Sequence, residues 1–69
     1  MSHVVRQALR DAGVSQRVAS TGAGIPLTTL VRRLSGRSPL SVTELAALAS
    51  LAGVPVSELV ARAEREAAA

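Results

Sequence analysis

The chain has 69 residues, no Cys, one His and no aromatic residue, so its length allows one domain, and it has no thiolate or histidine cluster to hold a metal ion. No segment has the roughly 20 consecutive apolar residues of a membrane-spanning helix, and no signal peptide is evident, so we expect one cytoplasmic domain over residues 1–69. Residues 1–37 contain six Arg and one Asp, whereas residues 38–69 contain two Arg and four Glu, a split that indicates a polyanion-binding surface supported by a scaffold.

Two short helices are predicted in the N-terminal part of the chain. The first covers about residues 2–12 and carries apolar residues at helical spacing before it stops at a glycine. The second covers residues 15–22 and begins with Ser15, a residue type that caps helix N-termini. Val18 and Ala19 are the residues of this second helix that we expect to point inward.

A third helix is predicted over residues 26–35, with Pro26 at its start, where the missing N–H has no cost. A helical wheel at 100° per residue divides it into two faces. The aliphatic face consists of Leu27, Leu30, Val31 and Leu34. The opposite face is polar, contains no acidic residue, and consists of Thr28, Thr29, Arg32 and Arg33.

Two further helices are predicted over residues 41–52 and 55–65. The first of them opens with the capping-box pattern, in which Ser41 and Glu44 satisfy each other's backbone N–H groups. No segment alternates with the period of a strand, and the connections are two to six residues long. The sequence therefore predicts an all-α fold, a compact bundle of five helices.

The polar face of the third helix suggests a negatively charged partner. Two arginines without an acidic neighbour are costly on a protein surface unless an anion covers them. A guanidinium binds a phosphate or the O6/N7 edge of guanine bidentately, and a Thr methyl packs against thymine. The alternative is a basic face that is merely solvated.

A short helix, a turn with glycine and a helix with one polar face form the plan of a helix-turn-helix. At these positions the chain resembles the Cro/C1-type helix-turn-helix domain of phage repressors and bacterial regulators, and it is similar to the variant found in actinobacteria and actinophages. The resemblance covers about residues 3–64. It rests on Ser15-Gln16, Val18-Ala19, Gly24-Ile25-Pro26, Thr28-Thr29-Leu30, Arg32 to Gly36, Leu51 to Val54 and Ser57-Glu58-Leu59.

The resemblance implies a lambda-repressor-like bundle whose second and third helices form the helix-turn-helix, with the third helix in the major groove of DNA. The residues that it implies for base contacts are Leu27, Thr28, Thr29, Arg32 and Arg33. Those that it implies for phosphate contacts are Ser15, Gln16, Arg17, Arg37 and Ser38. Arg6 and Arg10 either add outlying phosphate contacts or lie on a solvated face of the first helix.

The chain departs from the family pattern at two places. The pair Val18-Ala19 lies one residue further from Ile25 than is usual, which predicts a longer turn. Near the end of the third helix, Arg33 and Leu34 stand where the family often has an apolar residue followed by Glu. We therefore expect Leu34 to take the inward position and to leave Arg33 free for DNA.

One such domain contacts only a few base pairs, so we expect a symmetric homodimer, at least on DNA. The candidate dimer surface consists of Leu51, Val54, Val56 and Val60. The alternative is that these residues close the core of the monomer. The chain is expected to be either a stand-alone Cro-like regulator or the N-terminal domain of a repressor.

The leading functional prediction is a sequence-specific regulator that binds a double-stranded DNA operator as a phage or bacterial switch protein, for example a lysogeny switch. The alternative is a small helical protein-interaction module, antitoxin-like or an inhibitor of a host factor, whose basic face meets an acidic partner. The chain is not expected to be an enzyme, because it has no Cys, a lone terminal His3 and no paired carboxylates. No cofactor, metal, membrane or small-molecule ligand is expected.

Overall fold

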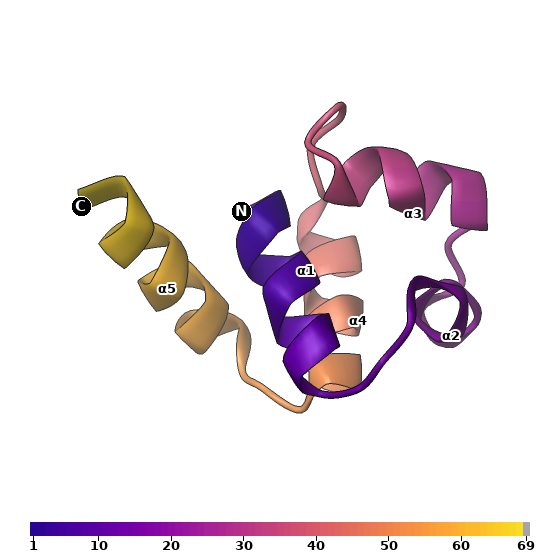
Figure 1. The fold of residues 1–69 in the computed structure, drawn as a ribbon, viewed down its shortest axis with the longest axis horizontal. Helices are drawn as coiled ribbons and strands as arrows, with labels where there is room; N and C mark the ends of the chain where they lie inside the picture. The colour runs from indigo at the N-terminus through magenta and orange to yellow at the C-terminus, as the bar shows by residue number, and fades with distance from the viewer. Residues whose placement is uncertain (69) are drawn as a thin grey trace.

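The computed structural model describes residues 1–68, and Figure 1 shows its five helices. They are α1 (Ser2–Asp11), α2 (Gln16–Ala23), α3 (Leu27–Leu34), α4 (Val42–Ala52) and α5 (Val56–Ala68). No residue between 1 and 68 lies in a strand, so the predicted all-α five-helix fold is confirmed. The largest difference from the expected bounds is at α5, which continues to Ala68 rather than ending near residue 65, because its alanine-rich end favours helix.

The helices are arranged around α1 and α4, which pack against each other at the centre. In the view of Figure 1, α5 lies on one side next to α1, whereas α2 and α3 lie on the other side. Helix α2 packs on both α3 and α4, and α3 also packs on α1. The Cα radius of gyration is 11.0 Å, which is about the value for a compact domain of this length.

The core consists of aliphatic side chains and alanines. The largest fully buried side chains come from four helices and are Val5, Leu30, Leu34, Leu48 and Leu59. Helix α2 contributes only Ala19, whose side chain is also fully buried. No polar or charged side chain of residues 1–68 is buried, so α3 is held in the bundle mainly by apolar contacts.

Hydrogen bonds at the helix termini confirm two predicted caps. The Ser15 hydroxyl oxygen accepts from the backbone N–H of Val18 at 3.1 Å. At the start of α4, the Ser41 hydroxyl accepts from the N–H of Glu44 at 3.1 Å, and the Glu44 carboxylate accepts from the N–H of Ser41 at 2.9 Å. These caps fix where α2 and α4 begin.

The turn between α2 and α3 covers three residues, Gly24 to Pro26. Gly24 has φ 68°, a left-handed conformation that glycine adopts without steric cost, and the N–H of Ile25 donates to the Ser20 carbonyl at 3.1 Å. Three residues is an ordinary length for such a turn, so the expectation of a longer turn is wrong. The expectation of an inward Val18 is wrong as well, because its side chain is 58% exposed and only Ala19 of the pair is buried.

A second glycine allows α2 to lie close to α4. A Cβ atom added at Gly22 would lie 2.8 Å from the Cδ2 atom of Leu51. Any larger residue at position 22 would therefore push the Leu51 side chain away. This contact helps to set the distance between α2 and α4.

Candidate nucleic-acid interface

The outward face of α3 is set by the two leucines that anchor it. Leu30 and Leu34 are fully buried one turn apart, which directs Thr28 and Arg32 to the opposite side of the helix. Both of these residues are exposed, and no ion pair or side-chain hydrogen bond within residues 1–68 involves the Arg32 guanidinium. The centre of the exposed face therefore carries one hydroxyl and one free guanidinium.

Two residues of the aliphatic face are exposed in the structure. Leu27 is 37% exposed at the first turn of α3, and Val31 is 45% exposed. The expectation that Val31 faces the bundle is wrong, because the bundle covers only the narrow strip formed by Leu30 and Leu34. The exposure of Leu27 leaves its side chain accessible for the base contact predicted for it. Val31 thus adds an apolar side chain to the outward face. The helical wheel placed Val31 on the aliphatic face, although at 100° per residue it lies only about 60° from Thr28, at the border between the two faces.

The sequence led us to expect a free Arg33, and this expectation is wrong. Its Nε atom lies 3.0 Å from Oε1 and 3.1 Å from Oε2 of Glu44, and its Nη1 atom donates to the Ser38 hydroxyl at 3.0 Å. Both partners lie outside α3, in the following loop and in the first turn of α4. Arg33 therefore connects the end of α3 to the start of α4, and much of its guanidinium is already occupied.

The same contacts act on the Glu44 carboxyl group. The backbone N–H of Ser41, followed by the Arg33 guanidinium, lowers the pKa of Glu44 below its ordinary value of 4.5. The ionised carboxylate is thus better stabilised in the folded chain than in the unfolded chain. This ion pair and the side-chain half of the capping box share one carboxylate, so protonation of Glu44 removes the ion pair and weakens the bond from the Ser41 N–H.

We expect this lowered pKa to appear in the pH dependence of stability. The contribution of Glu44 should be present above pH 4.5 and should disappear as the pH falls through the lower pKa of the folded state. The free energy of unfolding of Glu44→Gln should therefore be below that of the unmodified chain at pH 7, and the two should converge toward pH 3. Urea unfolding at several pH values measures this, with the exposed Glu64→Gln as control. A gap of constant size at every pH would contradict the prediction.

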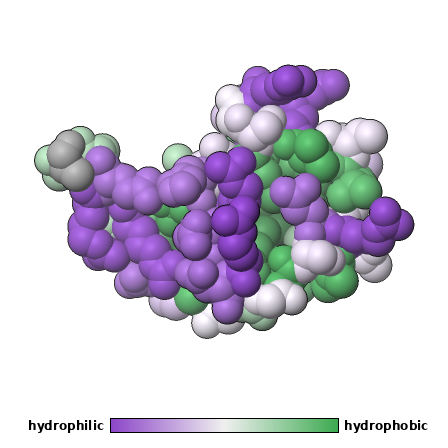
Figure 2. All heavy atoms as spheres, viewed as in Figure 1, coloured by the Kyte–Doolittle hydropathy of each residue, from purple (hydrophilic) through white to green (hydrophobic). Residues whose placement is uncertain are grey.

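The loop between α3 and α4 adds positive charge next to the outward face of α3. The backbone N–H of Arg37 donates to the Arg32 carbonyl at 3.1 Å, which holds the loop against the end of α3. The Arg37 side chain is exposed, whereas Ser38 is half-buried and its hydroxyl accepts from Arg33. Figure 2 shows hydrophilic residues over this projecting loop and over α1 and α5, with hydrophobic residues visible beside α3.

The start of α2 brings the other predicted phosphate contacts to the surface. Ser15, Gln16 and Arg17 are all exposed. The Ser15 hydroxyl is engaged as the helix cap, which leaves the side chains of Gln16 and Arg17 for an external partner. The predicted phosphate-contact residues thus lie in two separate segments, one at the start of α2 and one after α3.

The candidate dimer surface is only partly exposed. Leu51, Val54 and Val56 are half-buried and pack against the core, whereas Val60 is 39% exposed. The alternative, closure of the monomer core, therefore describes the first three of these residues. Dimerisation through this surface stays a prediction.

Two other features of the described chain limit the candidate sites. Within residues 1–68, no group of three or more His, Asp or Glu side chains lies close enough to hold a metal ion. In the same range, no single helix is long and apolar enough to span a membrane. Only α4 and α5 taken together reach that length, and they are bent by 101° relative to each other.

Comparison with known proteins supports the geometry of α2 and α3. A family model described as helix-turn-helix matches residues 5–59, which is well over half of the chain. The match begins in α1 and ends in α5, so it includes the turn at Gly24 and the whole of α3. No curated protein and no solved structure gives a significant match.

Proposed function

The chain belongs to the Cro/C1-type helix-turn-helix family, and on this premise we propose that it is a sequence-specific transcriptional regulator that binds a double-stranded DNA operator through the major groove. The observation that carries the proposal is the exposed face of α3, which presents Thr28, Val31 and Arg32 and contains no acidic residue. The buried Leu30 and Leu34 hold that face rigidly on the bundle.

The dimensions of α3 suit the major groove. Eight residues of helix are about 12 Å long, and a helix with its side chains is about 10–12 Å wide, close to the groove width of about 12 Å. Arg32 is proposed to donate to O6 and N7 of a guanine, and Val31 to pack against a thymine methyl group. Thr28 would bind at the centre of the contact, with Leu27 and Thr29 at its edges. Arg33 is proposed to brace the α3–α4 junction.

Phosphate contacts are proposed on both sides of α3. Gln16 and Arg17 would bind the backbone from the start of α2, and Arg37 from the loop after α3. Such contacts fix the position of the domain on the duplex and make binding salt-dependent, but they carry no sequence information. Ser15 and Ser38 are already hydrogen-bonded within the chain, so their proposed contacts would use their remaining hydrogen-bonding capacity.

The proposed biological setting is a Cro-like or repressor-type switch, phage or bacterial, that binds two half-sites as a homodimer. A single module of this size buries only about 600–1,000 Å² on DNA, which argues for a second copy to reach useful affinity. The proposed surface for this second copy includes the exposed Val60. Two-fold symmetry of the protein would then require a pseudo-palindromic operator.

The function is tested by titrating the chain against two duplexes in a fluorescence-anisotropy assay. One duplex carries the region upstream of its own gene and the other the same bases in scrambled order. We expect tighter binding to the first, with an affinity that falls steeply with salt. Equal affinity for both duplexes would overturn the proposal and would favour the alternative, a module that binds an acidic protein.

Arg37→Ala is expected to weaken binding to the upstream and scrambled duplexes by the same factor, because a phosphate contact is independent of sequence. The slope of log K against log salt should become shallower by about 0.9 for the one phosphate lost. Anisotropy titrations at several salt concentrations measure both quantities. A change in base preference at any operator position would contradict a phosphate role for Arg37.

A further inference from the structure

One arginine of α3 is neutralised within the fold. The Nε atom of Arg33 lies 3.0 Å from Oε1 and 3.1 Å from Oε2 of Glu44. With side-chain exposures of 27% and 18%, this is the least exposed ion pair in residues 1–68, and the other pairs in that range all involve residues of α5. Because water screens a half-buried pair less than an exposed one, the two charges largely cancel.

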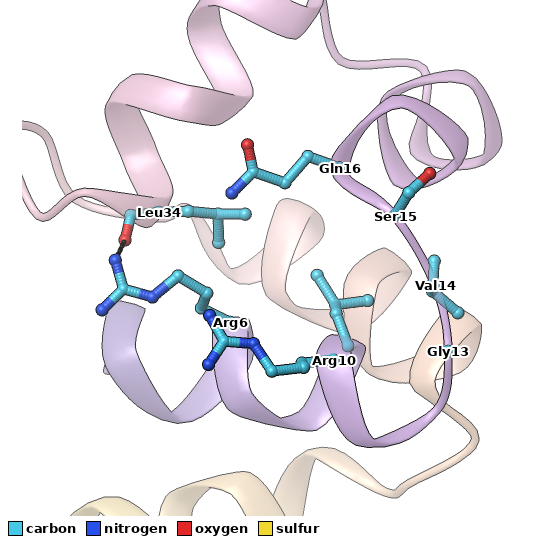
Figure 3. Close-up of a pocket in the computed structure, with 8 residues that line it drawn as sticks. Arg6, Arg10, Gly13, Val14, Ser15, Gln16 and Leu34 are labelled. Carbon is cyan, nitrogen blue, oxygen red and sulfur yellow. Dashed lines mark hydrogen bonds between the residues drawn. The ribbon is translucent and has the colours of Figure 1, made fainter.

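Other arginines near the end of α3 keep their charge. Arg32 and Arg37 are exposed and take part in no ion pair within residues 1–68. Figure 3 shows Arg6 on the α1 side of this end, where its Nη1 atom donates to the neutral Leu34 carbonyl at 3.4 Å. Of these arginines, only Arg33 is paired with a carboxylate in the part of the chain that the structure describes.

The paired guanidinium lies beside the proposed phosphate contacts. Its Nη1 atom donates to the Ser38 hydroxyl at 3.0 Å, and Ser38 and the neighbouring Arg37 are both proposed to bind the DNA backbone. A phosphate held by these two residues would be within reach of Arg33, because the Arg33 guanidinium already contacts Ser38. The pairing of Arg33 with Glu44 therefore removes one phosphate contact that the same surface could make.

The carboxylate that neutralises Arg33 is held in place independently of it. Oε1 of Glu44 accepts from the Ser41 N–H at 2.9 Å, and the Ser41 hydroxyl accepts from the Glu44 N–H at 3.1 Å. The positive end of the α4 dipole also favours a negative charge in this first turn. A DNA phosphate would thus have to compete for Arg33 with a carboxylate that is already oriented.

We propose that Glu44 is a positioning residue that holds Arg33 away from the DNA backbone and so limits the affinity of the chain for every duplex. The inference rests on the proposed function, because it requires the α3–α4 loop to lie against DNA. It assigns opposite roles to two adjacent arginines, since Arg32 contacts a base and Arg33 is kept out of the contact. A phosphate contact is independent of sequence, so the limit applies equally to operator and scrambled DNA.

Glu44→Gln tests this role. Gln also occurs at this position of capping boxes, so the substitution removes the charge and keeps an acceptor for the Ser41 N–H. The released Arg33 should bind one more phosphate, and the slope of log K against log salt should become steeper by about 0.9. Affinity for the upstream and scrambled duplexes should rise by the same factor, roughly fivefold to tenfold near 0.1 M salt. A merely structural role of Glu44 would not steepen the slope.

Two further variants separate the release of Arg33 from the loss of a negative charge. Glu64→Gln changes the net charge equally at an exposed residue of α5 and should keep the slope of the unmodified chain. The double variant Arg33→Ala, Glu44→Gln should return to that slope, because no guanidinium is left to release. Thermal unfolding of each variant shows whether the fold is retained. A steeper slope that persists in the double variant would overturn the proposal.

A measurement on the unmodified chain tests the same role without any substitution. NMR follows the Nε–H signals of Arg33 and Arg37 during a titration with the scrambled duplex. The Arg37 signal should shift as the side chain meets a phosphate, whereas the Arg33 signal should stay nearly constant, because its partner remains Glu44. A shift of equal size at Arg33 would place that side chain on the DNA and would refute its retention by Glu44.

The outcomes distinguish this inference from the proposed function. If the operator is preferred but Glu44→Gln does not steepen the slope, the role of Glu44 is refuted and the regulator proposal stands. If both duplexes bind equally while Glu44→Gln steepens the slope, sequence-specific regulation is refuted and the role of Glu44 stands. If the unmodified chain binds no duplex at all, both are refuted.

Discussion

Leu30→Ala is expected to lower the free energy of unfolding by about 2–5 kcal/mol, the usual cost of emptying a fully buried leucine site. Leu30 is fully buried and belongs to the short helix α3. A domain of this length has a total stability of only about 3–10 kcal/mol. The chain has no aromatic residue, so no large neighbour can fill the space. The variant should therefore lose a large fraction of its stability and unfold at a clearly lower temperature than the unmodified chain.

The neighbouring substitution Val31→Ala is the matched control. Val31 is in the same turn of α3, but its side chain is 45% exposed and contributes little to the core. Its effect on stability should stay within about 0.5–1 kcal/mol. Urea unfolding followed by circular dichroism measures both variants. Equal destabilisation by the two substitutions would contradict the outward placement of Val31.

Arg32→Ala is expected to weaken operator binding by about 1–3 kcal/mol, the range for a lost bidentate contact to guanine. The side chain is exposed and has no partner within residues 1–68, so the substitution should not affect folding. Binding to scrambled duplex should fall much less than binding to the operator. Discrimination should be relaxed at one base pair, while the other positions keep their preference.

Arg37→Ala provides the contrast for this result. Both substitutions remove one positive charge near the same end of α3, but only Arg32 is proposed to contact a base edge. Competition titrations with operators that carry every base at each position separate the two effects. A loss of equal size on all duplexes for Arg32→Ala would make Arg32 a phosphate contact and would remove the main base contact from the account.

Helix termini were well predicted because short-range hydrogen bonds determine them. The capping box of Ser41 and Glu44 and the cap at Ser15 both depend on residues within about four positions of each other. The sequence contains these signals directly. The order and type of all five helices followed from them and from the apolar spacing.

The environment of Arg33 was not predictable in the same way. Its partner Glu44 is eleven positions away, in a different helix, and its pairing depends on how the α3–α4 loop folds back. The helical wheel shows which residues share a face of α3 but not how wide a strip the bundle covers. This is why Val31 was expected to face the bundle. Val18 was misplaced because α2 packs on the bundle through small residues, the buried Ala19 together with Gly22 and Ala23, which leave Val18 outside the contact.

The most direct test of the central claim is a methylation-protection experiment with dimethyl sulfate on the operator complex. This reagent attacks guanine N7 in the major groove and adenine N3 in the minor groove. We predict that the unmodified chain protects guanine N7 within each half-site and that Arg32→Ala loses protection at one guanine while it still occupies the site. Protection confined to adenine N3, or no protection at full occupancy, would contradict the placement of α3 in the major groove.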